Sequence, residues 1–148
     1  MSRRAADTTA GRGIEGVLPE GWPRPRGYAN ALRIPAGRDL LVLAGQIGWD
    51  AEERLVGDGF VAQFEQALRN CLTLVAAAGG RPVDIVRLTM YCTDREAYLA
   101  ALREVGEAYR RVLGTHYPAM TLVQVSGLVE PGAVVEIEAT AALEPPDR

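Results

Sequence analysis

Two carboxylates stand two residues apart near the end of the chain, in the stretch VVEIEAT, residues 134–140. Read as a strand, this stretch places Glu136 and Glu138 on one face and apolar side chains, Ile137 among them, on the other. A carboxylate can accept a proton from water, and a rigid strand can hold it in place for that step. The pattern therefore predicts either a solvated sheet face or a working carboxylate at a pocket or a subunit interface.

Several other kinds of chemistry lack the residues that they need. All 16 basic residues are arginine, so the chain has no lysine for a Schiff base, for pyridoxal-phosphate attachment or for a Walker A loop. Its single histidine is His116, and Cys71 and Cys92 are isolated, so no metal-site spacing is present. We expect no metal and no cofactor, and we expect both cysteines to be buried as small apolar side chains.

Length and composition indicate one globular domain of 148 residues, with 48% hydrophobic and 24% charged residues. The net charge of −3, without a basic block, predicts no nucleic-acid partner. No apolar run is long enough to cross a membrane and no signal-peptide core is seen, so we expect a cytoplasmic protein without a membrane partner. Residues 1–20 are expected to be a flexible tail and residues 21–148 a single domain.

The elements that must position the carboxylates follow in the order β-β-(β)-α-β-α-β-β. The patterns predict strands at 29–35, 40–47, 84–92, 119–128 and 133–143, a short return strand within 49–57, and helices at 59–78 and 95–113. In strand 84–92, Arg87, Thr89 and Tyr91 share the face opposite the apolar one. Two helices can cover only one face of such a mixed sheet, so we expect the polar face to pack between subunits.

Several stretches, taken in order, resemble the RidA (YjgF) family of enamine/imine deaminases. They are GYANAL, LLVLAGQIGWD, VAQFEQALRNCLTLVAAAGG, DIVRLTMYCTD, YPAM and GAVVEIEATA, and together they extend from about residue 27 to 143. The resemblance implies an α+β, chorismate-mutase-like fold, with a mixed β-sheet and two helices packed on one face. It also implies a homotrimer of RidA-like domains whose ligand sites lie in clefts between subunits.

The same resemblance gives the two carboxylates different roles. It implies that Glu136 places or activates the water that attacks a C=N bond, without a metal or an organic cofactor. Glu138 is then structural, and Arg87 is the partner that we expect for it across neighbouring strands. The resemblance further implies substrate contacts from Tyr28, Gly45, Arg103, Met120 and Thr121.

The chain departs from the family pattern where the deaminases carry an arginine that binds the substrate carboxylate. The stretch YPAM places Met120 there, and an arginine–carboxylate pair is worth about 1.5–3 kcal/mol that methionine cannot supply. The serine usual before Gly-Gln is also replaced, by Ala44. Three interpretations follow. The first is that the substrate is more apolar and Met120 forms a wall of its pocket. The second is that Arg103 binds the substrate carboxylate in place of the missing arginine, and the alternative for Arg103 is a simple ion pair with Glu107. The third is that deaminase activity is lost.

We therefore expect a RidA-like enzyme that hydrolyses an enamine or imine of a small molecule, or catalyses a related water addition or tautomerisation. Its substrate should differ from the usual 2-aminoacrylate-derived imine. The alternative is a non-catalytic small-molecule-binding or regulatory trimer, and chaperone or ribonuclease roles remain behind these two. The enzyme and the binder differ at Glu136, because only a catalyst needs that carboxylate within reach of a pocket water.

Overall fold

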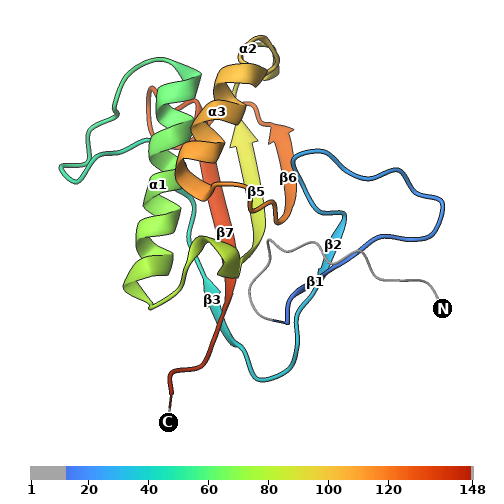
Figure 1. The fold of residues 1–148 in the computed structure, drawn as a ribbon. Helices are drawn as coiled ribbons and strands as arrows, with labels where there is room; N and C mark the ends of the chain where they lie inside the picture. The colour runs from blue at the N-terminus through green and yellow to red at the C-terminus, as the bar shows by residue number, and fades with distance from the viewer. Residues whose placement is uncertain (1–12, 148) are drawn as a thin grey trace.

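The computed structural model describes residues 13–147, and Figure 1 shows their arrangement. The elements are β1 (Glu15–Val17), β2 (Ala31–Arg33), β3 (Asp39–Val42), β4 (Gln46–Ile47), α1 (Phe60–Ala77), the 3-10 turn Pro82–Asp84, β5 (Ile85–Cys92), α2 (Arg95–Ala100), α3 (Leu102–Leu113), β6 (Ala119–Gln124) and β7 (Val135–Leu143). Helices α1 and α3 lie side by side over one face of the main sheet (Figure 1). No helix within this range is long and apolar enough to cross a membrane.

Strand β7 is the centre of the main sheet. The order is β3-β7-β5-β6, and β4 also pairs with β7. Strands β5 and β6 are parallel, which requires a crossover, and α2 and α3 supply it. The remaining pairs in this sheet are antiparallel. The expected α+β class with a mixed sheet is therefore confirmed.

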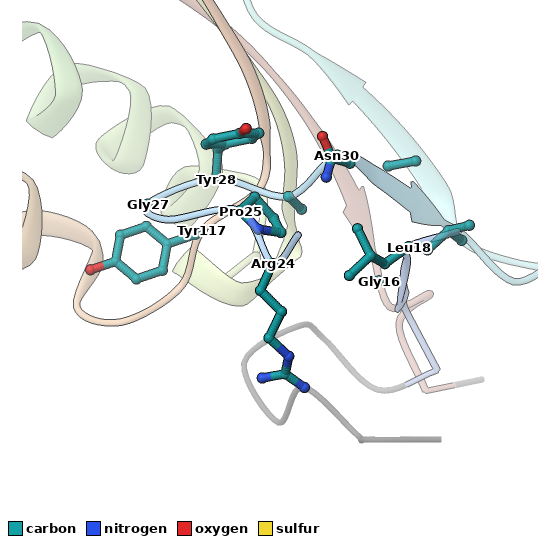
Figure 2. A pocket seen from close by; sticks show the side chains of 11 residues that line it. Gly16, Leu18, Arg24, Pro25, Gly27, Tyr28, Asn30 and Tyr117 are labelled. Atoms are coloured by element: carbon teal, nitrogen blue, oxygen red, sulfur yellow. The ribbon is translucent and has the colours of Figure 1, made fainter. Parts of the chain in front are cut away.

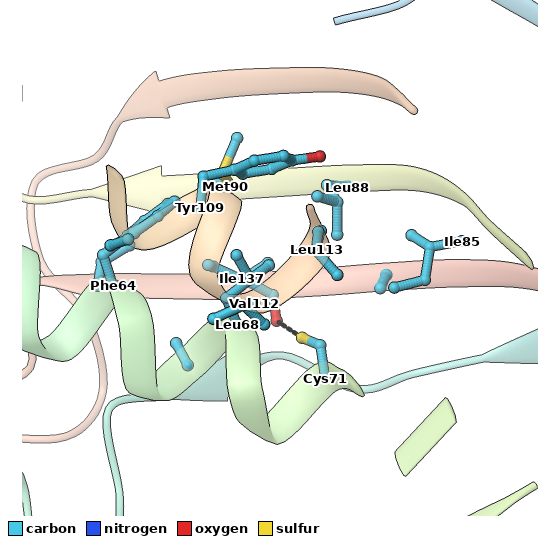
Figure 3. Close-up of a cluster of buried hydrophobic side chains, with 14 of the residues drawn as sticks. Phe64, Leu68, Cys71, Ile85, Leu88, Met90, Tyr109, Val112, Leu113 and Ile137 are labelled. Atoms are coloured by element: carbon cyan, nitrogen blue, oxygen red, sulfur yellow. Dashed lines mark hydrogen bonds between the residues drawn. The ribbon is translucent and has the colours of Figure 1, made fainter. Parts of the chain in front are cut away.

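Helix α1 forms because its apolar residues recur at helical spacing and face the sheet. Phe64, Leu68, Cys71 and Val75 are buried on this stripe, and Figure 3 labels the first three of them. The helix ends before Gly79, whose φ of 83° is the left-handed conformation that favours glycine after a helix. The predicted helix over 59–78 is thus confirmed within two residues.

Both cysteines are free and buried, as predicted. The Cys71 thiol lies in the core with its Sγ 3.5 Å from the Ile137 carbonyl oxygen (Figure 3). Burial away from water raises the pKa of Cys71 to about 12. Cys71 is therefore a packing residue and not a nucleophile at neutral pH.

The second expected helix is interrupted. Asp94 caps α2 by accepting a hydrogen bond from the Ala97 backbone N–H at 3.1 Å. Ala101 then leaves helical geometry, with φ −112° and ψ 20°, and α3 begins after it. Leu102, the first residue after this break, is 50% exposed. The prediction of a single helix over residues 95–113 is therefore wrong, because two helices, α2 and α3, meet at Ala101.

Strand β1 falls inside the stretch that was expected to be a tail. It pairs antiparallel with β2, and Ile14 just before it is buried against Val86 and Ala142. Residues 14–17 are therefore packed on the domain, contrary to that expectation. Residues 1–12 of the expected tail lie outside the described residues.

Candidate functional site

The face of the sheet that the helices leave uncovered is polar along its two central strands, as the alternation predicted. In the ladder between β5 and β7, Tyr91 lies opposite Glu136 and Thr89 lies opposite Glu138. The intervening side chains, such as Leu88 and Ile137, are fully buried under the helices. The polar set therefore sits on a rigid two-strand platform at the middle of the sheet.

Glu138 is held by a tyrosine. The Tyr91 hydroxyl donates a hydrogen bond of 2.8 Å to Glu138 Oε1. This bond to a carboxylate, which favours the protonated phenol, raises the pKa of Tyr91 above its usual value. Arg87 lies opposite Thr140 in the ladder and forms no ion pair with Glu138 among the described residues. The expectation that Arg87 is the partner of Glu138 is therefore wrong. Arg87 and Tyr91 are both diagonal neighbours of Glu138 in the ladder, and it is the Tyr91 hydroxyl that forms the bond.

Glu136 contrasts with its neighbour. Its half-buried side chain forms no hydrogen bond or ion pair with any residue in the range 13–147. The carboxylate lies directly against Gly45, where an added Cβ would overlap Glu136 Oε1. Only glycine permits so close an approach of backbone and carboxylate. The structure thus brings Glu136 and Gly45 together, both of them predicted site residues.

A β-bulge makes this contact possible. Val42 at the end of β3 pairs with Thr140, and Gln46 at the start of β4 pairs with Ile137. The four residue steps from 42 to 46 therefore lie opposite only three steps along β7, from 140 to 137. The extra residue lies within 43–45 and interrupts the regular pleat. The apolar run over residues 40–47 predicts a continuous strand instead, although an isolated glycine such as Gly45 is typical of this irregularity.

Met120 lies on the opposite face of the sheet from Glu136. It pairs with Leu88, whose side chain is in the core under the helices. Met120 lines a groove between α3 and β6, together with Tyr109 on α3. Thr121, one residue on, pairs with Thr89 and is exposed on the polar face. Within one chain, therefore, Met120 and Glu136 do not share a pocket.

Tyr28 is brought to the same end of the molecule as Met120. The Ala29 N–H donates to the Pro118 carbonyl oxygen at 3.0 Å, so this segment runs beside the start of β6. Tyr28 is 44% exposed and lines a hollow that Figure 2 shows, with Tyr117 nearby. Tyr117 also lines the groove beside Met120, so the hollow and the groove adjoin.

Arg103 stands apart from both of these surfaces. Its side chain is 85% exposed, and its Nε donates to Glu107 Oε1 at 3.1 Å, one helical turn along α3. This is the solvated i,i+4 pair that was the plain alternative to a binding role. The groove is lined instead by Gly106 and Arg110, which sequence reasoning did not select. An isolated glycine inside a helical pattern was the signal that could have drawn attention to them.

The described part of the chain holds no cluster of three or more His, Cys, Asp or Glu side chains that could bind a metal ion. His116 is buried, and its Nε2 lies 2.7 Å from the Ile85 carbonyl oxygen. This hydrogen bond ties the loop before β6 to the start of β5, which is a structural use of the imidazole.

Comparison with known proteins places this geometry in a family. The family model for Endoribonuclease L-PSP matches residues 24–143. The chain belongs to this family. It is 36% identical to Protein DfrA of Myxococcus xanthus over 115 residues, which are 77% of this chain and 83% of that protein. It is 31% identical to human 2-iminobutanoate/2-iminopropanoate deaminase over 106 residues, 71% and 74% of the two chains.

Solved structures of the Endoribonuclease L-PSP family agree with the fold. The Rid-family protein YyfB of Yersinia pestis matches with a TM-score of 0.77 and 32% identity, over 88% of this chain and 98% of that one. Rv2704 of Mycobacterium tuberculosis, a member of the YjgF/YER057c/UK114 family, matches with a TM-score of 0.58 and 37% identity, over 79% and 87%. The resemblance to the RidA (YjgF) family is therefore confirmed.

Proposed function

We propose that this chain is a cytoplasmic, cofactor-independent hydrolase of imines or enamines, and that its site forms between copies of the chain. The observation that carries the proposal is the environment of Glu136. The carboxylate is half-buried on the central strand β7, rests against Gly45 and has no hydrogen-bond partner among residues 13–147. It is therefore available to a water molecule, and relatives named 2-iminobutanoate/2-iminopropanoate deaminase support the reaction class.

The proposed reaction needs one carboxylate and one water. Water oxygen adds to the carbon of the C=N bond while Glu136 accepts a proton from the water. Glu136 then returns that proton to the nitrogen, which gives a tetrahedral intermediate with one hydroxyl and one amino group. The carboxylate next carries the hydroxyl proton to the amino nitrogen as the C–N bond breaks, so that ammonia leaves and a C=O bond forms in the product. An enamine enters the same sequence after one proton is added at its carbon and one is lost from its nitrogen, which gives the imine.

The proposal requires a second copy of the chain, because Met120 and Tyr28 do not share a pocket with Glu136. The uncovered face of the sheet offers a surface for that copy. On β3, Leu40 and Val42 are each 71% exposed. Val42 adjoins Arg87 on this face. Apolar side chains this exposed, next to a polar platform, support a homotrimer in which the face is buried between subunits.

Met120 affects which substrates we expect the site to bind. Methionine in a groove cannot form the charge-assisted pair that an arginine would make with a substrate carboxylate. We therefore expect weak turnover of the small 2-aminoacrylate-derived imine. A non-catalytic small-molecule-binding trimer remains the second candidate, because the replaced residues, Ala44 and Met120, both lack polar side-chain groups.

The test is ammonia release from a panel of 2-imino acids generated in place from amino acids by an amino-acid oxidase. We expect at least one member to be hydrolysed faster than in buffer, and Glu136→Gln to abolish the enhancement while the protein stays folded. Full activity in Glu136→Gln would remove the proposed mechanism. No enhancement across the panel, with tight binding of the 2-oxo acid products, would favour the binding trimer.

A further inference from the structure

The groove between α3 and β6 is lined almost entirely by apolar and aromatic side chains. Phe64 and Met90 lie at its base, and Leu122 on β6 lines it beside Met120. Figure 3 shows Phe64, Met90 and Tyr109 on the side of the sheet that the helices cover. The Tyr109 hydroxyl donates to the His116 carbonyl oxygen at 2.6 Å. The Tyr109 ring stacks on Tyr117 with ring centroids 5.2 Å apart, and both residues line the groove. Such a surface suits a flat, apolar group.

A glycine keeps the helix wall of this groove open. Gly106 lies inside α3, where glycine is the least favourable residue after proline. Close packing does not explain it, because an added Cβ would meet only Arg110 Nη1, at an ordinary contact distance of 3.5 Å. Apart from adjacent residues and the helix's own backbone, no other atom of the described chain comes within 4 Å of that position. Only the flexible Arg110 side chain borders the space above Gly106, so a ligand that entered it would contact the guanidinium.

The guanidinium group of Arg110 lies beside the same space. Arg110 lies one helical turn after Gly106, and side chains on a helix lean toward its N-terminus, so the guanidinium reaches back over the groove. Its helix neighbours Arg103 and Arg111 pair with Glu107 and Glu65. The Arg110 side chain, in contrast, forms no ion pair or hydrogen bond with any of residues 13–147.

We propose that this groove binds the aromatic side chain of an aryl-bearing 2-imino or 2-oxo carboxylate, and that Arg110 binds its carboxylate. The inference rests on the proposed function and names its substrate class. The ring would lie against Tyr109 and Met120 in the space that Gly106 leaves, and the guanidinium would form a charge-assisted pair at the mouth. The reacting carbon, next to the carboxylate, would then lie at the mouth as well. Glu136 of a neighbouring copy would have to reach this point.

Titration calorimetry of the full chain with three probes tests the class of ligand. Phenylpyruvate carries both the ring and the carboxylate, pyruvate lacks the ring, and phenylacetone lacks the carboxylate. We expect phenylpyruvate to bind about tenfold or more tightly than either of the others. Equal affinity for phenylpyruvate and pyruvate would overturn the aromatic site, and equal affinity for phenylpyruvate and phenylacetone would overturn the role of Arg110.

Substitutions that line the groove test whether phenylpyruvate binds there. Gly106→Leu should fill the groove and lower phenylpyruvate affinity by about tenfold or more, without lowering the melting temperature, because leucine favours the helix. Gly106→Ala is the matched control and should keep most of the affinity. Arg110→Gln should weaken phenylpyruvate and leave phenylacetone unchanged, while Arg69→Gln, on the surface of α1, should change neither. Unchanged binding in Gly106→Leu, or a change in its assembly mass instead, would overturn the proposal.

Failure of this inference can be told apart from failure of the proposed function. Binding needs no catalysis, so Glu136→Gln should bind phenylpyruvate as the unmodified chain does. Groove-dependent binding without Glu136-dependent hydrolysis of the imine made from phenylalanine would support the groove and contradict the hydrolase. Glu136-dependent hydrolysis with no loss of aromatic preference in Gly106→Leu would overturn the groove alone.

Discussion

Glu136 and Glu138 are the same residue type on the same face of β7, yet their surroundings indicate different roles for them. Tyr91 donates to Glu138, whereas the Glu136 carboxylate lies against Gly45 and forms no hydrogen bond or ion pair with the described residues. Alternation alone cannot separate two residues that share a face. The distinction arises from strand register and from a glycine that lies far away in the sequence.

Replacing Glu138 with glutamine should affect stability more than activity. The amide oxygen can still accept from the Tyr91 hydroxyl, but the bond loses its charge assistance. We expect a loss of about 0.5–1.5 kcal/mol in the free energy of unfolding, measured with urea. Imine hydrolysis should stay close to that of the unmodified chain. A large loss of activity at unchanged stability would show that Glu138 takes part in the chemistry.

Gly45→Ala should act through Glu136. The added Cβ overlaps the carboxylate, so the side chain must move from its place on the strand. If a misplaced base lowers the rate by about a hundredfold, the barrier has risen by about 2.7 kcal/mol. Gly16→Ala is the matched control, because a Cβ there meets nothing within 4 Å. Equal hydrolysis rates in the two variants would contradict a catalytic role for the contact.

At the level of elements, Glu65 links the two long helices. It accepts hydrogen bonds from Arg111 on α3 at 2.8 Å and from Arg69 on α1 at 2.7 Å. The bond from Arg111 contributes most, and together they lower the pKa of Glu65 from 4.5 to about 2. A lowered pKa means that the stabilisation is present above the unfolded value and is lost as the pH falls toward the folded one.

The helix link therefore predicts a pH-dependent difference between the unmodified chain and Glu65→Gln. The difference in unfolding free energy should be about 1 kcal/mol near neutral pH, because solvent reaches the pair. It should shrink as the pH falls from about 5 toward 2. Urea unfolding across this range measures it. A difference that stays constant down to pH 2 would show that the carboxylate charge does not stabilise the helix pair.

Elements with one dominant pattern could be predicted from the sequence, and irregular ones could not. The stripe from Phe60 to Val75 fixed α1, and alternation identified the apolar face of β5. The break at Ala101 and the bulge within 43–45 lie in stretches whose apolar pattern continues through them. Their cause is backbone geometry, and among the residues at those positions only Gly45, an isolated glycine in a strand pattern, points to an irregularity.

The candidate site was predictable only where residues come from one strand or from a family resemblance. Glu136 and Gly45 were found in this way, and the structure places them in contact. Arg103 was chosen by its place in the helix, but the structure pairs it with Glu107 in solvent. Gly106 and Arg110 become visible only when α3 and β6 lie side by side, which requires the tertiary fold.

For the whole molecule, the proposed trimer depends on the exposed apolar edge of the sheet. Val42 on β3 is 71% exposed beside Arg87 and Thr140. Placing a second positive charge beside Arg87, with Val42→Arg, should separate the subunits, because like charges buried without a partner cost several kcal/mol at an interface. Light scattering at micromolar concentration should then report a trimer for the unmodified chain and a monomer for the variant. A monomeric unmodified chain would contradict the proposed assembly.

The central claim, that Glu136 of one copy works on a ligand held by another, is tested most directly by mixing two impaired chains. Glu136→Gln lacks the base and Gly106→Leu lacks the open groove. On an aromatic imine below saturation, the first variant alone should be inactive and the second alone should be about tenfold or more less active than the unmodified chain. A mixed trimer contains some interfaces where an intact Glu136 faces an intact groove. Co-refolding at equal amounts should therefore restore about one quarter of the activity of the unmodified protein. Mixed assemblies no more active than either parent would contradict a site shared between subunits.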